Sequence, residues 1–209
     1  MSNGFFTVTE QIENTIVIER SKFICSIKNV IDEDEAKAFI ESVRKKHSLA
    51  NHNCYAYIAD DKGLVQKFSD DGEPQGTAGL PMLDVLKNKR MFKTVVVVTR
   101  YFGGVKLGTG GLVRAYGGSV VECLQKAKIV NMQQAVFMSV TLDYELYSKF
   151  LKLLSGSNVC LLNTEFANSV TVDFSVKNDY HKIFIDNLTE TFNGKVSAVI
   201  NKVDYSAFR

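Results

Sequence analysis

The 209-residue sequence contains no tryptophan, two prolines, three histidines and four cysteines. The cysteines are scattered and form no CxxC pair, which excludes a secreted-type disulfide framework and is typical of reduced thiols in a cytoplasm. Three histidines are too few for a histidine-rich metal site. We therefore predict no metal and no other cofactor.

Long apolar runs are also absent. No run approaches the roughly 20 residues that a helix needs to cross a bilayer. The N-terminal residues lack the basic stretch and apolar run of a signal peptide. We therefore expect a cytoplasmic protein with no membrane partner. With 45% apolar and 23% charged residues, the chain is globular, and its length predicts one or two domains.

Charge and glycine are present but unevenly distributed. The net charge is only +2, yet residues 85–128 contain nine basic residues and one acidic residue, a local charge of +8. Ten of the fourteen glycines lie between Gly72 and Gly118. Clustered glycine favours a backbone that another group approaches closely. The basic, glycine-rich segment is thus compatible with an anionic partner, which the overall charge does not require.

The first 130 residues predict a mixture of strands and helices. A helix is expected over residues 32–47, because acids at its start and bases at its end complement the helix dipole. Residues 94–99 form a continuous β-branched run, typical of a strand buried on both faces. The remaining expected strands lie near residues 14–19, 22–30, 53–59 and 64–69, and the remaining helices near residues 78–88 and 110–127.

The last part of the sequence predicts one unit repeated twice. Strands are expected near residues 135–142, 159–165, 169–176 and 196–203, with helices near residues 144–154 and 179–191. The order βαββαβ is that of a ferredoxin-like fold. We therefore predict an α+β protein with two domains, residues 1–130 and residues 131–209.

Three carboxylates, Asp70, Asp71 and Glu73, lie close together in the sequence. They could form a ligand or metal shell or act in acid–base chemistry, although their spacing is not that of an EF-hand. The favoured alternative is a structured turn, in which Asp and Gly make local bonds and Thr77 caps the next helix.

A glycine-rich segment, residues 100–114, leads from the β-branched strand into a helix. Free N–H groups at a helix start form an anion site, to which Arg100, Lys106 and Arg114 would add charge. The segment is not a P-loop, because a threonine stands where the lysine must be. A tight loop that packs the helix on a sheet is the alternative. Tyr101 and Phe102 are interpreted as core residues or as base-stacking groups.

The tripeptide His52-Asn53-Cys54 places a histidine and a cysteine two residues apart on a predicted strand. Such residues share a face, so a nucleophile and its base could lie side by side. A base normally reaches a nucleophile from elsewhere in the fold, and nearby residues complete no metal site. A structural or ligand-shell role is therefore favoured over catalysis, and the hydrolase signature GxSxG is absent.

Taken together, these segments resemble the Impact family in its bacterial YigZ branch. The resemblance covers residues 21–127 and rests on Ser21-Lys22-Phe23-Ile24, His52-Asn53-Cys54-Tyr55-Ala56-Tyr57, Asp70-Asp71-Gly72-Glu73-Pro74, Gly76-Thr77-Ala78-Gly79, Arg100-Tyr101-Phe102-Gly103-Gly104 and Leu107-Gly108-Thr109-Gly110-Gly111-Leu112-Val113-Arg114-Ala115-Tyr116.

The resemblance implies a first domain with the fold of ribosomal protein S5 domain 2. It implies a second domain like the last domain of elongation factor G. It also implies a role in translation, since eukaryotic relatives regulate translation by binding a protein partner. For bacterial members it implies no secure enzymatic activity.

Three functional hypotheses follow. The leading one is a non-enzymatic, translation-associated regulator that contacts RNA or the ribosome through a basic, glycine-rich face. The second is a protein or enzyme that binds a phosphorylated small molecule through Asp70, Asp71 and Glu73 and the Gly103–Gly111 loop. The third is a protein-interaction regulator. The anion- or nucleic-acid-binding candidates are Lys87, Arg90, Arg100, Lys106, Gly108, Thr109, Gly110, Gly111 and Arg114. The ligand-shell candidates are His52, Cys54, Asp70, Asp71, Glu73 and Thr77, with no catalytic residue assigned.

Overall fold

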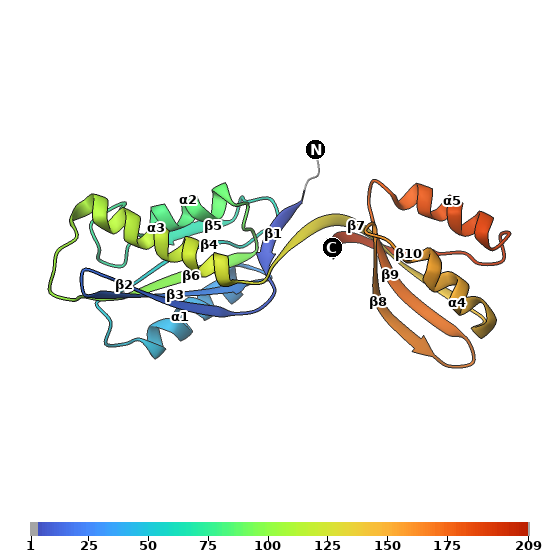
Figure 1. Ribbon diagram of the computed structural model, residues 1–209, viewed down its shortest axis with the longest axis horizontal. Coiled ribbons are helices and arrows are strands. Elements are labelled where there is room, and N and C mark those ends of the chain that lie inside the picture. The colour runs from blue at the N-terminus through green and yellow to red at the C-terminus, as the bar shows by residue number, and fades with distance from the viewer. Residues whose placement is uncertain (1–3, 209) are drawn as a thin grey trace. The chain divides into compact units, whose positions relative to one another are not determined.

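The computed structural model describes residues 4–208, which divide into two units, one of residues 5–130 and one of residues 131–208 with Gly4. Figure 1 labels the helices and strands of both units. Each unit combines one sheet with helices, so the chain is a mixed α+β protein. No helix within residues 4–208 has the length and apolar character that crossing a membrane requires.

The first unit is built on an antiparallel sheet with the strand order β2-β3-β6-β4-β5. Its central strand, β6, is buried from Thr94 to Arg100, as the β-branched run predicts. A further strand, β1 (Phe5–Val8), forms a parallel bridge from Phe6 to Met91. The bounds of the five sheet strands are β2 (Ile12–Ile18), β3 (Ser21–Asn29), β4 (His52–Ile58), β5 (Gln66–Ser69) and β6 (Thr94–Tyr101).

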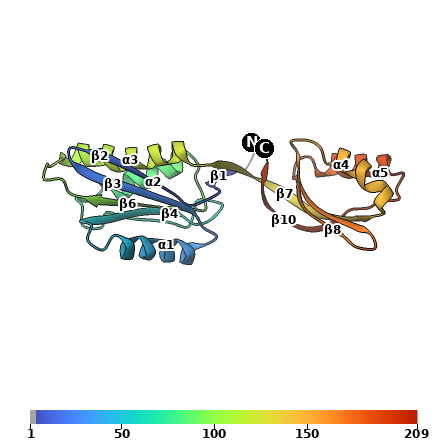
Figure 2. The ribbon, with the colours of Figure 1, turned by 60° about the horizontal axis from the view of Figure 1, so that its bottom comes forward.

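Helices cover both faces of this sheet (Figure 2). On one face, α1 (Glu33–Lys46) packs on Val95 and Val97. On the other, α2 (Gly79–Asn88) and α3 (Gly108–Lys126) pack on Val96 and Val98. The alternation follows from strand geometry, because successive side chains point to opposite faces. The α1 helix has the expected acidic first turn and basic last turn.

The second unit has the βαββαβ order expected from the sequence. Its antiparallel strands follow the order β10-β7-β9-β8. The core contains Phe150, Phe174 and Phe184, where the helices pack on the sheet. The β7 strand begins six residues earlier than predicted. The elements are β7 (Ile129–Leu142), α4 (Tyr144–Leu153), β8 (Val159–Phe166), β9 (Val170–Lys177), α5 (His181–Thr191) and β10 (Val199–Phe208).

Candidate functional site

The sequence motifs of the first unit meet at one end of its sheet. The β4 strand begins where β6 ends, so His52 lies opposite Arg100. The β3 strand also begins there, with Lys22 opposite Tyr101. The β2–β3 turn packs so closely on the chain after β6 that a Cβ at Gly103 would lie 2.0 Å from the carbonyl carbon of Arg20. This position therefore requires glycine.

A buried hydrogen-bonded network forms the centre of this end. Glu73 Oε1 accepts bonds from Arg100 Nη1 and from the Tyr116 hydroxyl, each at 2.7 Å. Ser21 Oγ accepts from Arg100 Nη2 at 3.4 Å and from the Gly103 N–H at 3.1 Å. Side chains of Arg100 and Glu73 are only 7% and 4% exposed. The network thus joins β3, β6, α3 and the turn after β5.

Arg100 is therefore an internal structural cation. Its guanidinium lies over the rings of Phe23 and Phe102, at 5.4 Å from each ring centroid. Its Nε is buried and has no hydrogen-bond partner among residues 4–208. This geometry does not support the prediction that Arg100 is a surface contact for an anion, because Glu73 already balances its charge.

Asp70 holds the start of α2. Its Oδ1 accepts from the N–H groups of Ala78 and Gly79 at 3.0 and 2.8 Å, and its Oδ2 accepts from the Gly76 N–H at 2.8 Å. The prediction that Thr77 caps this helix was wrong. The Thr77 hydroxyl donates instead to the Pro74 carbonyl at 2.6 Å within the turn, and α2 has no cap from its adjacent side chain.

Asp71 serves the neighbouring strand and α1. Its carboxylate accepts from the Asn53 N–H at 2.6 Å and from Arg44 Nη2 at 3.2 Å. Its carbonyl lies 2.8 Å from His52 Nδ1, so this nitrogen donates, and His52 Nε2 lies 3.9 Å from Glu73 Oε1. The three carboxylates thus bind different partners. Within residues 4–208, no group of three His, Cys, Asp or Glu side chains is arranged to hold a metal ion.

Cys54 is buried beside this network. Its thiol donates to the Asp70 carbonyl at 2.9 Å. Burial raises the pKa of Cys54 strongly, and the nearby carboxylates raise it further. A cysteine that stays protonated at neutral pH is a poor nucleophile. The geometry therefore supports a structural role for Cys54.

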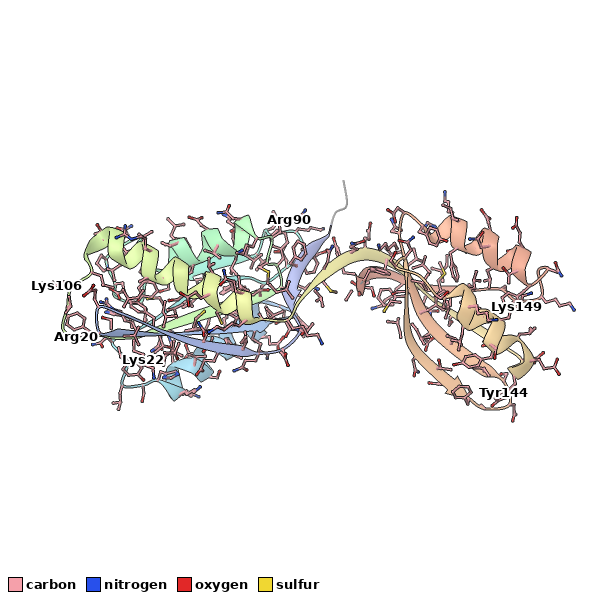
Figure 3. All side chains as sticks on the ribbon, viewed as in Figure 1. Arg20, Lys22, Arg90, Lys106, Tyr144 and Lys149 are labelled. Carbon is pink, nitrogen blue, oxygen red and sulfur yellow. The ribbon has the colours of Figure 1, made fainter. Side chains whose placement is uncertain are left out.

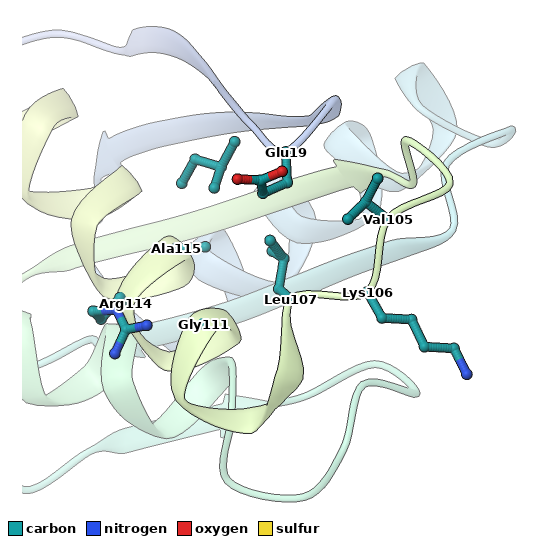
Figure 4. A pocket seen from close by; sticks show the side chains of 8 residues that line it. Glu19, Val105, Lys106, Leu107, Gly111, Arg114 and Ala115 are labelled. Carbon is teal, nitrogen blue, oxygen red and sulfur yellow. The ribbon is translucent and has the colours of Figure 1, made fainter.

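Two cavities flank the loop that enters α3. The first, of about 410 Å³, is lined by Glu73, Pro74, Arg100, Phe102, Lys106, Leu107, Gly108, Thr109 and Leu112. The second, of about 490 Å³ and shown in Figure 4, is lined by Ile18, Glu19, Val105, Lys106, Leu107, Gly111, Arg114 and Ala115. The side chain of Lys106 extends outward from the loop. Leu107, the residue before α3, provides no side-chain cap to it. The first turn of α3 consists of Gly108, Thr109, Gly110 and Gly111.

The predicted basic residues do not form one surface. Lys106 lies at the same end of the unit as Arg20 and Lys22, whereas Arg90 lies at the other (Figure 3). Lys87 and Arg90 are near or beyond the end of α2, which is about 15 Å long at 1.5 Å per residue. The basic candidates are therefore divided between the two ends of the first unit.

Arg20 and Lys22 were missing from the predicted site. They flank Ser21, which is part of the family-like pattern, and the turn they belong to brings them to this end. The sequence motif that contains Lys22 was therefore recognisable. It carried no information about which other motifs would lie beside it in the fold. Within residues 4–208, the exposed side chains of Arg20, Lys22, Lys106 and Arg114 form no ion pair.

Known proteins resemble both units. The Impact N-terminal domain matches residues 19–124, and a domain of unknown function (DUF1949) matches residues 140–195. The chain is 44% identical over 195 residues to IMPACT family member YvyE of Bacillus subtilis, covering 93% of this chain and 90% of that one. It is 38% identical over 151 residues to IMPACT family member YigZ of Escherichia coli, covering 71% and 74%. The chain is also similar to a solved structure titled "Crystal structure of an hypothetical protein". The two superpose with a TM-score of 0.61 at 30% sequence identity, and the match covers 97% of this chain and 98% of the other.

Proposed function

The chain belongs to the IMPACT family, and we propose that it is a non-enzymatic, translation-associated protein that contacts RNA, free or within the ribosome. The contact surface is the basic end, which we define as Arg20, Lys106 and Arg114 near the start of α3, together with Lys22, which lies opposite Tyr101 at the same end of the sheet but on its α1 face. One observation carries the proposal: these four exposed cations form no ion pair within residues 4–208. Their charge is therefore available to an external anion.

Backbone groups at the basic end suit the same partner. Leu107 provides no side-chain cap to the first turn of α3, and a helix start with free N–H groups attracts phosphate. A Cβ added at Gly108 would meet nothing within 4 Å, and a Cβ at Gly110 would meet only the end of Arg114 at 3.7 Å. Packing therefore does not require glycine at either position, whereas the left-handed backbone of Gly108, with φ +68°, itself favours glycine there. Open backbone there would let a phosphate approach closely.

The buried network argues for a non-enzymatic role. Glu73 already accepts two hydrogen bonds, one from Arg100, and Cys54 is held as a thiol. Neither side chain is therefore available as a free base or nucleophile. In this proposal the network is structural, and it fixes the loop on which Lys106 stands.

We further propose the finer fold assignments that the resemblance implies. The antiparallel sheet and helices of the first unit support the fold of ribosomal protein S5 domain 2. The βαββαβ order and the strand order β10-β7-β9-β8 support a ferredoxin-like second unit similar to the last domain of elongation factor G. Both assignments fit a protein that works in translation.

The test measures RNA affinity as a function of salt. Fluorescence anisotropy of a labelled RNA is followed with the wild type and with the double variant Arg20→Ala/Lys106→Ala. The control is Lys87→Ala/Lys89→Ala, which removes the same charge from the end of α2. We expect the first variant alone to weaken binding and to flatten the slope of log affinity against log salt by about 1.4, or about 0.7 per lost phosphate contact.

Two results would contradict the proposal. The first is equal loss of affinity in both double variants, which would mean that only net charge matters. The second is an absence of RNA binding at low salt together with an absence of ribosome co-sedimentation. Recovery of one nuclease-resistant protein partner from native cells would then favour a protein-interaction regulator.

A further inference from the structure

We propose that the cavity beside Phe102 holds one unstacked nucleotide of single-stranded RNA, with its base against the Phe102 ring and its phosphate near Lys106. This inference rests on the proposed RNA contact and specifies which form of RNA is bound. It concerns the cavity of about 410 Å³ between the turn at Glu73–Pro74 and the start of α3.

Phe102 is the aromatic side chain presented to this cavity. It is 45% exposed and forms part of the cavity lining. The adjacent Tyr101 is turned toward α1, where its hydroxyl lies 3.1 Å from His47 Nδ1 and its ring meets the His47 ring edge-on. The two neighbouring aromatics therefore have different roles, and only Phe102 is free to stack on a ligand.

Phe102 is held in place before any ligand binds. Its N–H donates to Asn51 Oδ1 at 2.8 Å. Its ring lies against the Arg100 guanidinium, which Glu73 and Ser21 fix in turn. A side chain that is already ordered loses little conformational entropy on binding. The buried network thus makes Phe102 a rigid stacking platform.

The rest of the cavity suits a nucleotide. Its volume lies within the range of about 300–1,000 Å³ typical of small-molecule sites. Leu107 and Leu112 supply apolar wall, while Lys106 and Thr109 supply a cation and a hydroxyl. The one carboxylate in the lining, Glu73, is paired with Arg100, so its charge repels a phosphate only weakly.

The cavity also selects the form of RNA. A base in a duplex is stacked and paired, and its faces cannot reach an aromatic side chain. Aromatic platforms beside positive charge are the usual means of binding single strands with little sequence preference. We therefore expect binding to single-stranded RNA to depend on Phe102, and binding to duplex RNA to depend only on the basic end.

The absence of tryptophan from the chain allows a site-specific test. Phe102→Trp introduces one tryptophan at the cavity, and Phe68→Trp introduces one at a matched exposed phenylalanine on β5, which is 41% exposed. Tryptophan emission is measured during titration with oligoadenylate, with duplex RNA and with adenosine monophosphate. We expect oligoadenylate to quench Phe102→Trp and not Phe68→Trp, and duplex RNA to quench neither.

A second measurement uses affinity. Phe102→Ala removes one stacking contact, so single-stranded RNA should bind about 5- to 150-fold more weakly. Phe102→Tyr should retain most of the affinity, and circular dichroism checks that both variants are folded. Anisotropy of labelled RNA provides the binding constants, with Phe68→Ala as the control.

The outcomes separate this inference from the RNA proposal. Unchanged emission and affinity in the Phe102 variants, with RNA still bound through Lys106, would overturn the nucleotide cavity alone. Absence of any RNA binding would overturn both. Quenching by adenosine monophosphate at the same concentrations as by oligoadenylate would overturn the RNA assignment and identify a free nucleotide as the ligand.

Discussion

Replacing Glu73 with glutamine should destabilise the first unit strongly. The substitution keeps the size of the side chain and one oxygen that can accept from Tyr116. It removes the negative charge that faces Arg100 at 2.7 Å. Both side chains are more than nine-tenths buried, so water cannot replace the lost counter-ion. The variant therefore leaves a guanidinium buried without an opposite charge.

The expected magnitude follows from burial. Removing one partner of a buried ion pair costs about 3–5 kcal/mol. We expect about 3 kcal/mol, the low end, because the glutamine amide still provides an oxygen. Glu41→Gln is the control: its carboxylate pairs with Arg44 at 2.9 Å but is 59% exposed, and an exposed pair contributes about 0–1 kcal/mol.

The assay must report on each unit separately, since a chain with two units need not unfold in one step. Native-state amide hydrogen exchange provides this resolution. The free energy of opening should fall in Glu73→Gln for the amides of Val96–Val98 on β6, relative to the wild type. If the decrease at β6 is no larger than that in Glu41→Gln, the pair contributes little to stability and the reasoning is refuted.

Three further predictions concern the same end of the sheet. Burial, with a smaller effect from Lys46, lowers the pKa of His47, so the unfolded chain binds the proton more readily than the folded one. Hydrogen exchange should therefore show that the wild type loses stability as the pH falls through about 6.5. The substitution His47→Gln should reduce that loss. Asp70→Ala should cost about 0.5–2 kcal/mol in thermal unfolding because α2 loses its cap, and an unchanged melting temperature would contradict this. Gly103→Ala should prevent the first unit from folding, which circular dichroism would detect. Gly118→Ala is the contrasting variant: its Cβ would meet nothing within 4 Å, so it should stabilise α3 by up to about 1 kcal/mol.

Elements with a clear period could be predicted from the sequence. The β-branched run predicted β6 as a strand with two covered faces. In α1, the apolar residues Ala36, Phe39, Ile40 and Val43 recur at intervals of three, one and three residues and form its buried side. The two βαβ repeats of the second unit were equally regular. In contrast, β1 has four residues, too few to show a period. Its position depends on contacts with residues 90–92, which no local pattern encodes.

Candidate site residues were recognisable, but their orientations were not. Arg100 stands in a basic, glycine-rich segment and resembles a surface cation. Its partner Glu73 lies 27 residues away along the chain. Tyr116, which donates to the same carboxylate, lies 43 residues from Glu73. Such separations leave no local signal. The capping role of Asp70 was hidden for the same reason, because the side chain acts on a helix that starts nine residues later.

The structure separates residues that build the site from residues that face a partner, and this separation changes how a loss of binding is interpreted. Arg100 supports Phe102 and pairs with Glu73, so under the proposed RNA contact we expect its replacement to weaken binding by disordering Phe102. We expect no phosphate contact to be lost and the salt slope to stay unchanged. Under the same proposal, replacing Lys106 should remove a direct contact and flatten the slope. Affinity alone therefore cannot assign a role to a residue at this end of the sheet, whereas affinity and salt dependence together can.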